Sequence, residues 1–228
     1  MPYTAVRLEP SGAPYRIEDP EDETNIISVV GFYGSVHRVV AAEPDGAGFM
    51  WYKLFNDKPD ETPFYYILAR HMRMIPPSAF EPINPGADKM MEVNLTEQTI
   101  TCYESGVPVF STLTSSGGDG FATPLGEHAV VYKQPSRYMF SDPEQEAFSD
   151  PNFFDLPGVP FNIFFTTLGH AIHGTYWHGD YGRPRSHGCL NVLPETARWL
   201  YRWVEPVAPY DMDAAGSSAD PGTPIIVV

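Results

Sequence analysis

Proline is the feature of this sequence that most limits the fold. The chain has 24 prolines among 228 residues, about twice the usual share of roughly 5%. Proline has no backbone N–H to donate, and its ring clashes with the preceding helical turn, so it interrupts both helices and sheet interiors. We therefore expect a mainly β protein with long loops and little helix.

The first third of the chain predicts a small β module between two irregular segments. Residues 1–20 are polar and proline-rich, which favours an N-terminal tail. Short apolar runs within residues 21–76 are separated by Gly, Pro and Asp clusters, as in a small barrel or sandwich. Residues 77–88 are rich in proline and predict a linker. The rest of the chain, residues 89–228, is then a second domain.

Residues 89–228 have the alternating pattern of β-strands and one helical stripe. A hairpin is expected from Gln98–Tyr103 and Val107–Leu113 around Glu104-Ser105-Gly106. Further strands are expected at residues 128–133, 162–167 and 224–228. A helix is expected after Pro194, where one apolar face is formed by Ala197, Leu200, Tyr201 and Val204.

Charge and hydropathy exclude two classes of partner. The formal net charge is −15, from 29 acidic and 14 basic residues, which repels nucleic acid. No apolar run approaches the roughly 20 residues of a spanning helix, so direct membrane insertion is not expected. The first residues lack the basic and apolar regions of a secretory signal. The chain is thus either cytoplasmic or lacks a leader that the native protein carries.

The two cysteines have different surroundings. Cys102 lies in an alternating apolar run, where a buried filler is expected. Cys189 lies among glycine, serine and histidine, and four of the seven histidines fall between residues 170 and 187. A thiol with this neighbourhood is a nucleophile activated by histidine, a metal ligand or an ordinary loop residue. No spacing here is typical of a zinc ligand set, but residue chemistry alone leaves the three readings open.

The order of motifs adds a family resemblance. His173-Gly174-Thr175 is followed by Ser186-His187-Gly188-Cys189-Leu190-Asn191, with Ser186 thirteen residues after His173. This resembles the signature of the L,D-transpeptidase catalytic domain of the YkuD type. The segments Thr123–Gly126 and Gly222–Val227 are similar to further motifs of that family, so that the resemblance spans about residues 89–228.

The resemblance implies a β-sandwich catalytic domain with one or two short helices and a defined set of roles. Cys189 is expected to attack a peptide carbonyl, and His173 to act as its base while the Gly174 carbonyl fixes the imidazole tautomer. The N–H groups of Gly188 and Cys189 are expected to form the oxyanion hole. His187 belongs to the same motif and is expected to shape the site.

Substrate recognition is expected from residues around this motif. The candidates are Ser186, Asn191, Tyr176, Trp177, Arg183 and Arg185. Asn191 occupies a position at which many relatives carry arginine, so recognition of the stem carboxylate is expected to differ here. Peptide acyl exchange needs only a nucleophile, a base and oxyanion donors, so neither a metal nor an organic cofactor is expected.

The N-terminal module has a second, shorter resemblance. Trp51-Tyr52-Lys53-Leu54, followed by Tyr65–Arg70, resembles the second half of a bacterial SH3-like module. Modules of this kind often bind cell-wall peptide, which implies a targeting role. Simple packing against the catalytic domain explains the same residues equally well.

The function implied is that of a transferase, a peptidoglycan L,D-transpeptidase of cell-wall biogenesis and cell shape, open to carbapenems. Its partners are a donor tetrapeptide stem and an acceptor amine. Hydrolysis of the same thioester, as in an L,D-carboxypeptidase, and wall binding without catalysis are the alternatives. The substrate implies an extracytoplasmic location in the cell envelope, with a leader or anchor absent from this chain.

Overall fold

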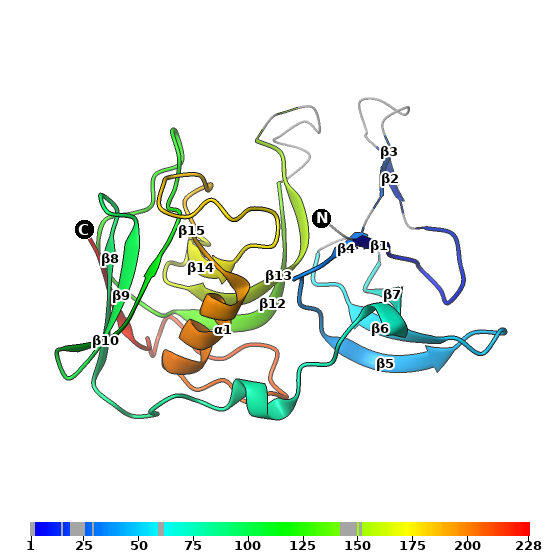
Figure 1. Ribbon diagram of the computed structural model, residues 1–228, viewed down its shortest axis with the longest axis horizontal. Helices are drawn as coiled ribbons and strands as arrows, with labels where there is room; N and C mark the ends of the chain where they lie inside the picture. Colours follow the sequence, from blue (N-terminus) through cyan, green and yellow to red (C-terminus); the bar gives the residue numbers. More distant parts are fainter. Residues whose placement is uncertain are drawn as a thin grey trace. The chain divides into compact units, whose positions relative to one another are not determined.

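The computed structural model describes residues 3–14, 16–18, 26–28, 30–58, 62–141, 150 and 152–228, and it is mainly β (Figure 1). Residues 21–25, at the start of the expected SH3-like module, lie outside the described residues. The described chain divides into two compact units: residues 1–75 with 136–159, and residues 76–135 with 160–228. Strands dominate both units, as the proline content predicts.

The unit that holds the N-terminus is built from short antiparallel strands. A three-stranded sheet is formed by β5 (Val39–Pro44), β6 (Met50–Phe55) and β7 (Phe64–Leu68). Two separate pairs join β1 (Tyr3–Ala5) with β4 (Val30–Phe32), and β2 (Arg16–Glu18) with β3 (Ile26–Ser28). A single turn of 3-10 helix, η1 (Ala69–His71), follows β7.

The core of this unit explains why the first residues are ordered. Val6 is fully buried against Leu54, Tyr65 and Ile67, and Arg7 exchanges backbone hydrogen bonds with Tyr66 at 2.7 and 3.0 Å. These described residues are therefore part of the β structure, which differs from the tail expected for residues 1–20. The Trp51 and Tyr65 motifs lie on paired strands β6 and β7, and their SH3-like character remains a prediction.

A second difference concerns residues 136–159, which the sequence assigns to the 89–228 domain. They belong to the same unit as residues 1–75. Gly158 accepts a hydrogen bond from the Val36 N–H at 2.8 Å, and Ser136 Oγ donates to the Val36 carbonyl at 2.5 Å. Lys58 forms an ion pair with Asp155 at 2.7 Å. Such pairings over long sequence separations leave no local signal in the sequence.

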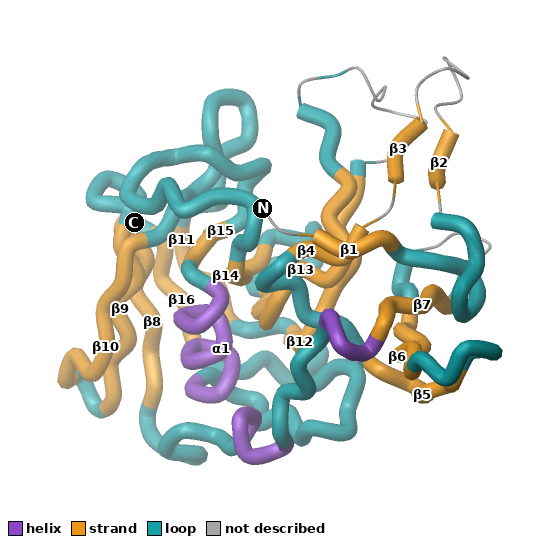
Figure 2. Tube along the Cα trace, turned by 45° about the vertical axis from the view of Figure 1, so that its right-hand side comes forward, coloured by secondary structure: helices purple, strands orange, loops and turns teal. Residues whose placement is uncertain are grey.

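Residues of the second unit form the helix, the whole of one sheet and part of another. One sheet has the order β10-β9-β8-β16-β11 and the other has the order β12-β13-β14-β15 (Figures 1 and 2). The bounds of the first are β8 Lys89–Asn94, β9 Thr99–Glu104, β10 Val107–Leu113, β11 Gly126–Ala129 and β16 Pro224–Val227. The bounds of the second are β12 Tyr132–Phe140, β13 Asp155–Phe164, β14 Ala171–Gly174 and β15 Leu190–Val192.

The expected hairpin and helix are both confirmed. β9 and β10 pair antiparallel around Ser105 and Gly106, and α1 (Pro194–Trp203) begins at the predicted proline. Ala197, Leu200 and Tyr201 are buried, while Trp199 stacks on Phe110 of β10 at 4.2 Å between ring centroids. The apolar face of α1 therefore joins β14 to the β9–β10 hairpin.

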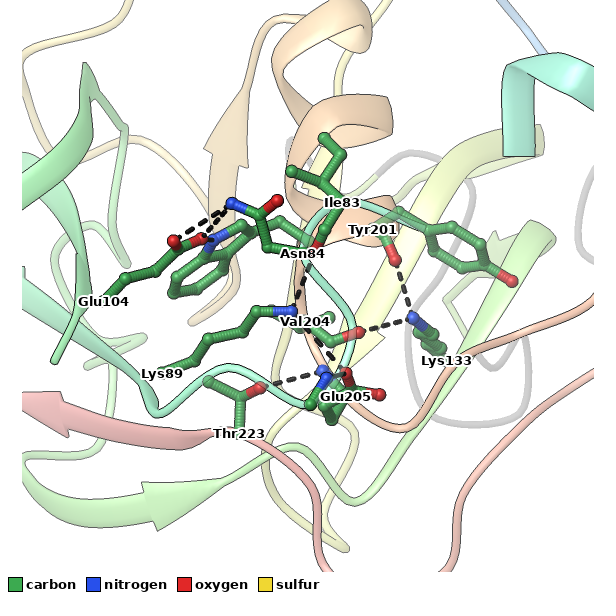
Figure 3. Close-up of polar contacts among 11 residues, drawn as sticks. Ile83, Asn84, Lys89, Glu104, Lys133, Tyr201, Val204, Glu205 and Thr223 are labelled. Carbon is green, nitrogen blue, oxygen red and sulfur yellow. Dashed lines mark hydrogen bonds and ion pairs between the residues drawn. The ribbon is translucent and has the colours of Figure 1, made fainter. Parts of the chain in front are cut away.

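Buried lysines hold the end of α1 (Figure 3). Lys133 is 1% exposed, and its ammonium donates to the carbonyls of Tyr201 and Val204 at 2.6 and 2.8 Å. These are carbonyls of the last helical turn, where a cation is favourable.

Lys89 donates to the Ile83 carbonyl at 2.9 Å and so fixes the segment before β8. Residues 77–88 include η2 (Pro77–Phe80) and are packed, because the Phe80 ring contacts those of Phe161, Tyr201 and Tyr210.

Candidate active site

The parallel pairing of β14 and β15 brings the segments that hold the expected base and nucleophile side by side. The register places Ile172 beside Leu190 and His173 beside Asn191. Cys189 comes directly before β15, and its thiol contacts the backbone of Ala171, two residues before His173 on β14.

His173 is held in one tautomer. Its side chain is almost fully buried, its Nδ1 lies 3.1 Å from the Gly174 carbonyl oxygen, and its Nε2 lies 3.2 Å from Asn191 Nδ2. A carbonyl can only accept, so Nδ1 carries the proton and Nε2 presents its lone pair. Burial lowers the pKa of His173 to about 4, so the imidazole is neutral at physiological pH.

Gly174 is required by the packing of α1. A Cβ at this position would lie 2.8 Å from Pro194 Cα and 2.9 Å from Pro160 Cγ. Both are closer than real Cβ contacts, and neither is a flexible chain end. Glycine after His173 therefore lets the first residue of α1 pack directly on β14 and brings the Gly174 carbonyl to the imidazole.

Burial raises the pKa of the Cys189 thiol. The residue is partly exposed, and Sγ lies 3.9 Å from the Gly169 carbonyl oxygen. Burial of the sulfur raises the pKa of Cys189 to about 11, against a smaller opposing effect of the Ala171 backbone. A raised pKa favours the thiol over the thiolate, in contrast to the low pKa of strongly activated cysteines.

The segment before Cys189 is fixed by hydroxyl groups. Ser186 Oγ donates to the Cys189 carbonyl at 2.5 Å and accepts from the Gly188 N–H at 3.1 Å. Thr123 Oγ1 donates to the Gly188 carbonyl at 2.9 Å. Ser186 therefore acts on the main chain here, and Thr123 is a site residue that the sequence indicated only as part of a motif.

Two other histidines flank this segment. Thr166 Oγ1 accepts from the Leu168 and His170 N–H groups at 3.3 and 3.1 Å and lies 2.9 Å from His170 Nδ1. With both acceptor positions used, the hydroxyl donates to Nδ1, so Nε2 carries the proton of His170. His187 is exposed, and its ring lies 4.3 Å from that of Phe121.

The expected substrate-binding residues lie in two groups. Trp177 is partly exposed, with its ring 5.8 Å from that of His173, whereas Tyr176 is buried behind it. Arg183 and Arg185 are exposed and both pair with Asp180. Hydrogen bonding from Arg183 is the main cause that lowers the pKa of Asp180. The two arginines thus share one carboxylate, which leaves one net positive charge on this loop.

Sequence reasoning missed the role of residues that act through hydrogen bonds. His178 Nε2 lies 3.0 Å from Asn191 Oδ1, and no motif in the sequence indicated this contact. Ser115 exchanges backbone hydrogen bonds with Asn191 at 2.9 Å and donates its hydroxyl to the Asp180 carbonyl at 2.9 Å. A lone serine in a loop gives no signal of this kind.

Within the described ranges, no group of three or more His, Cys, Asp or Glu side chains is arranged to hold a metal ion. In the same part of the chain, no helix combines the length and the apolar character that crossing a membrane requires.

Comparison with known proteins identifies the family of this fold and site. The model of the YkuD family, the L,D-transpeptidase catalytic domain, matches residues 88–227, and the chain belongs to this family. A curated relative, probable L,D-transpeptidase 3 of Mycobacterium tuberculosis, is 30% identical over 93 residues, which cover 40% of this chain and 34% of the relative. The chain therefore matches about a third of that protein.

Two solved structures show the same fold at low identity. L,D-transpeptidase 3 of Mycobacterium tuberculosis, in complex with a faropenem-derived adduct, has a TM-score of 0.50 at 24% identity, covering 62% of this chain and 60% of that one. An L,D-transpeptidase from Mycobacterium smegmatis has a TM-score of 0.51 at 21% identity. The match covers 85% of this chain and 100% of the M. smegmatis chain.

Proposed function

We propose that this chain is a peptidoglycan L,D-transpeptidase that joins stem peptides through a thioester on Cys189. The observation that supports the proposal is the pairing of β14, which holds His173 with its lone pair at Nε2, with β15, which begins directly after Cys189. Membership of the L,D-transpeptidase family gives the reaction class. The expected partners are a donor tetrapeptide stem and an acceptor amine of the cell wall, and the expected location is the cell envelope outside the cytoplasm.

The first half-reaction forms the thioester. His173 Nε2 takes the proton of the Cys189 thiol as the sulfur attacks the carbonyl of the third donor residue. The oxyanion is stabilised by the N–H groups of Gly188 and Cys189. The tetrahedral intermediate then collapses, the C–N bond breaks, and the released D-alanine amine receives the proton from His173.

The second half-reaction releases the enzyme. The acceptor amine attacks the thioester carbonyl and gives its proton to His173, and the C–S bond breaks to return the thiol at Cys189. Water in place of the amine gives the tripeptide, which is the L,D-carboxypeptidase outcome. Access of the acceptor decides between these products.

The proposal requires two hydrogen bonds to be exchanged when substrate binds. The Gly188 N–H donates to Ser186 Oγ and the Asn191 amide occupies His173 Nε2. A substrate oxygen must replace Ser186 Oγ as the acceptor, and the thiol must replace Asn191 beside the imidazole. Trp177, Arg183 and Arg185 then remain candidates for contact with the stem peptide, since all three have exposed surface.

The test is mass spectrometry of purified disaccharide-tetrapeptide after incubation with the protein. We expect a cross-linked dimer that has lost one D-alanine, no product with Cys189→Ala, and normal product with the matched control Cys102→Ala. Full activity of Cys189→Ala would exclude the mechanism. Tripeptide without dimer would assign the carboxypeptidase, and binding without either product would assign a non-catalytic wall-binding protein.

An independent probe is covalent capture by a carbapenem. One fold relative is described in complex with a faropenem-derived adduct, and faropenem is a β-lactam. A carbapenem should therefore increase the intact mass of this protein by one drug molecule at Cys189. The wall-binding role of the expected SH3-like module, with its boundaries at residues 21–76, stays a separate prediction.

A further inference from the structure

Four hydrogen bonds connect the catalytic imidazole with a loop outside the two strands. The Asp180 N–H lies 3.3 Å from His178 Nδ1, and His178 Nε2 lies 3.0 Å from Asn191 Oδ1. Asn191 Nδ2 lies 3.2 Å from His173 Nε2, and His173 Nδ1 lies 3.1 Å from the Gly174 carbonyl. One continuous chain of contacts therefore runs from a backbone amide to a backbone carbonyl.

The two ends of this chain fix its direction. A backbone N–H can only donate and a carbonyl can only accept. His178 must therefore accept at Nδ1 and donate from Nε2, which makes Asn191 Oδ1 the acceptor and leaves Asn191 Nδ2 to donate. His173 then accepts at Nε2 and donates from Nδ1. Only one assignment of tautomers and of the amide orientation satisfies all four bonds.

We propose that His178 is a positioning residue for His173 and acts on it through the Asn191 amide. This inference rests on the proposed role of His173 as the base. The donor at His178 Nε2 holds Asn191 with its amide nitrogen toward His173, and this keeps the His173 proton on Nδ1 and its lone pair at Nε2 until the thiol displaces Asn191. Asn191 is then part of the machinery that orients the base, in addition to any contact with substrate.

Burial makes the amide orientation consequential. Asn191 is 3% exposed and His173 is 2% exposed, so an unpaired donor or acceptor between them is costly. Once the thiol has displaced Asn191 and His173 holds the thiol proton at Nε2, the Asn191 nitrogen cannot return to the imidazole, because both groups are donors. Turning the amide over would satisfy His173 but would oppose the His178 Nε2–H. This series of hydrogen bonds therefore favours transfer of the proton from His173 to the leaving amine.

Desolvation favours the neutral form of both imidazoles, as these four hydrogen bonds require. His178 faces Asp180 and Arg185 from its own loop, with Tyr181 beside it and His173 across the Asn191 amide. Desolvation is the largest cause that lowers the pKa of His178. The hydrogen bond to Asn191 and the charge of Asp180 raise this pKa, and the charge of Arg185 lowers it.

The experiment compares His178→Gln with His178→Phe and uses Tyr181→Phe as the matched control. Glutamine places an amide N–H near the position of Nε2, whereas phenylalanine keeps the ring and removes the donor. Tyr181→Phe removes a hydroxyl that contacts Thr175 and the His178 carbonyl in the same loop, and it leaves both nitrogens of the His178 ring and the four bonds intact. One measurement is the ¹⁵N spectrum of the His173 imidazole, and the other is the pH profile of Cys189 alkylation by iodoacetamide, followed by peptide mapping.

In the wild type and in Tyr181→Phe we expect a protonated Nδ1 and an unprotonated Nε2 at His173. In His178→Phe we expect a mixture of tautomers and alkylation of Cys189 that is about threefold to tenfold slower between pH 6 and 9. His178→Gln should restore most of both signals. If His178→Phe does not fold, the inference is tested by comparing the His173 spectrum and the Cys189 alkylation profile of His178→Gln with those of the wild type.

Either of two results would overturn the inference. One is a wild-type spectrum in which His173 Nε2 carries the proton, and the other is a His178→Phe protein with the wild-type tautomer and pH profile. The imidazole spectrum requires no turnover. A protein without transpeptidase activity but with the expected tautomers would therefore disprove the proposed function and leave this inference standing.

Discussion

Two hydrogen bonds clamp Gln98 to Ser116 in the interior of the second unit, and a third joins Gln98 to Leu95. Gln98 Oε1 accepts from the Ser116 N–H at 2.8 Å, and Gln98 Nε2 donates to Ser116 Oγ at 2.7 Å and to the Leu95 carbonyl at 2.7 Å. The Ser116 carbonyl in turn accepts from the N–H groups of Arg185 and Ser186 at 2.8 and 2.9 Å. A side chain at the turn between β8 and β9 thus supports the segment that leads to Cys189.

Removing this clamp should destabilise the protein and disturb the site. In Gln98→Leu the Ser116 N–H would be buried without an acceptor, which costs about 1–3 kcal/mol. We expect that loss in the free energy of unfolding from urea denaturation, together with a lower rate of product formation. Equal urea denaturation midpoints for the wild type and Gln98→Leu would refute the stabilising role assigned to Gln98.

The protonated thiol predicts an alkaline reactivity profile for Cys189. Burial raises its pKa to about 11, so the thiolate fraction increases continuously as the pH rises from 6 to 10. Without substrate, the rate of iodoacetamide labelling of Cys189 should rise in parallel with the thiolate fraction, with no plateau near pH 7. Cys102 is buried with its pKa raised to about 12 and should label far more slowly. A labelling plateau at neutral pH would show a preformed ion pair and contradict this reading.

Gly188→Ala should distort the segment before the thiol. Gly188 has φ +102°, a backbone conformation that side chains rarely adopt. A Cβ there would lie 2.9 Å from His170 Cδ2, and Thr166 holds that ring in place. We expect at least a tenfold loss of product formation. Gly120→Ala is the control, since its φ is +83° with open space around the Cβ, and it should retain most activity.

Lys133 makes stability depend on pH in the alkaline range. Desolvation lowers its pKa from 10.5 to about 7, so the folded state binds fewer protons than the unfolded state between these values. The free energy of unfolding therefore rises with pH through this window, by at most a few kcal/mol. Above pH 9 the raised pKa values of Cys102 and Cys189 act in the opposite direction.

Thermal or urea unfolding at several pH values measures this effect. The wild type should become more stable from pH 7 to about 9, and Lys133→Met should show a smaller rise. Met keeps most of the buried chain but leaves the Tyr201 and Val204 carbonyls without the ammonium. An identical slope in the two proteins would mean that Lys133 is not the group responsible.

Much of the fold could be read from the sequence because its signals are local. The hairpin at Ser105-Gly106 and the helix after Pro194 depend on turn chemistry and on a helical apolar stripe, and both are present. The roles expected for His173 and Cys189 came only from the family resemblance. The pairing of β14 with β15, which brings their segments together, was not predicted.

What the sequence missed depends on contacts between distant residues. The place of residues 136–159 beside residues 1–75 follows from bonds such as that of Ser136 with Val36. The clamp at Gln98 and the alignment of His178 with Asn191 follow from buried amides whose partners lie far along the chain. Polar side chains of this kind have no periodicity, so a pattern of residues does not reveal them.

The raised pKa of Cys189 also affects how readily this thiol is oxidised. Peroxide oxidation and disulfide exchange both proceed through the thiolate. At neutral pH only a minute fraction of Cys189 is present as the thiolate that these reactions need, and the second thiol, at Cys102, is buried. The desolvation that suppresses the nucleophile at rest therefore also shields it from damage.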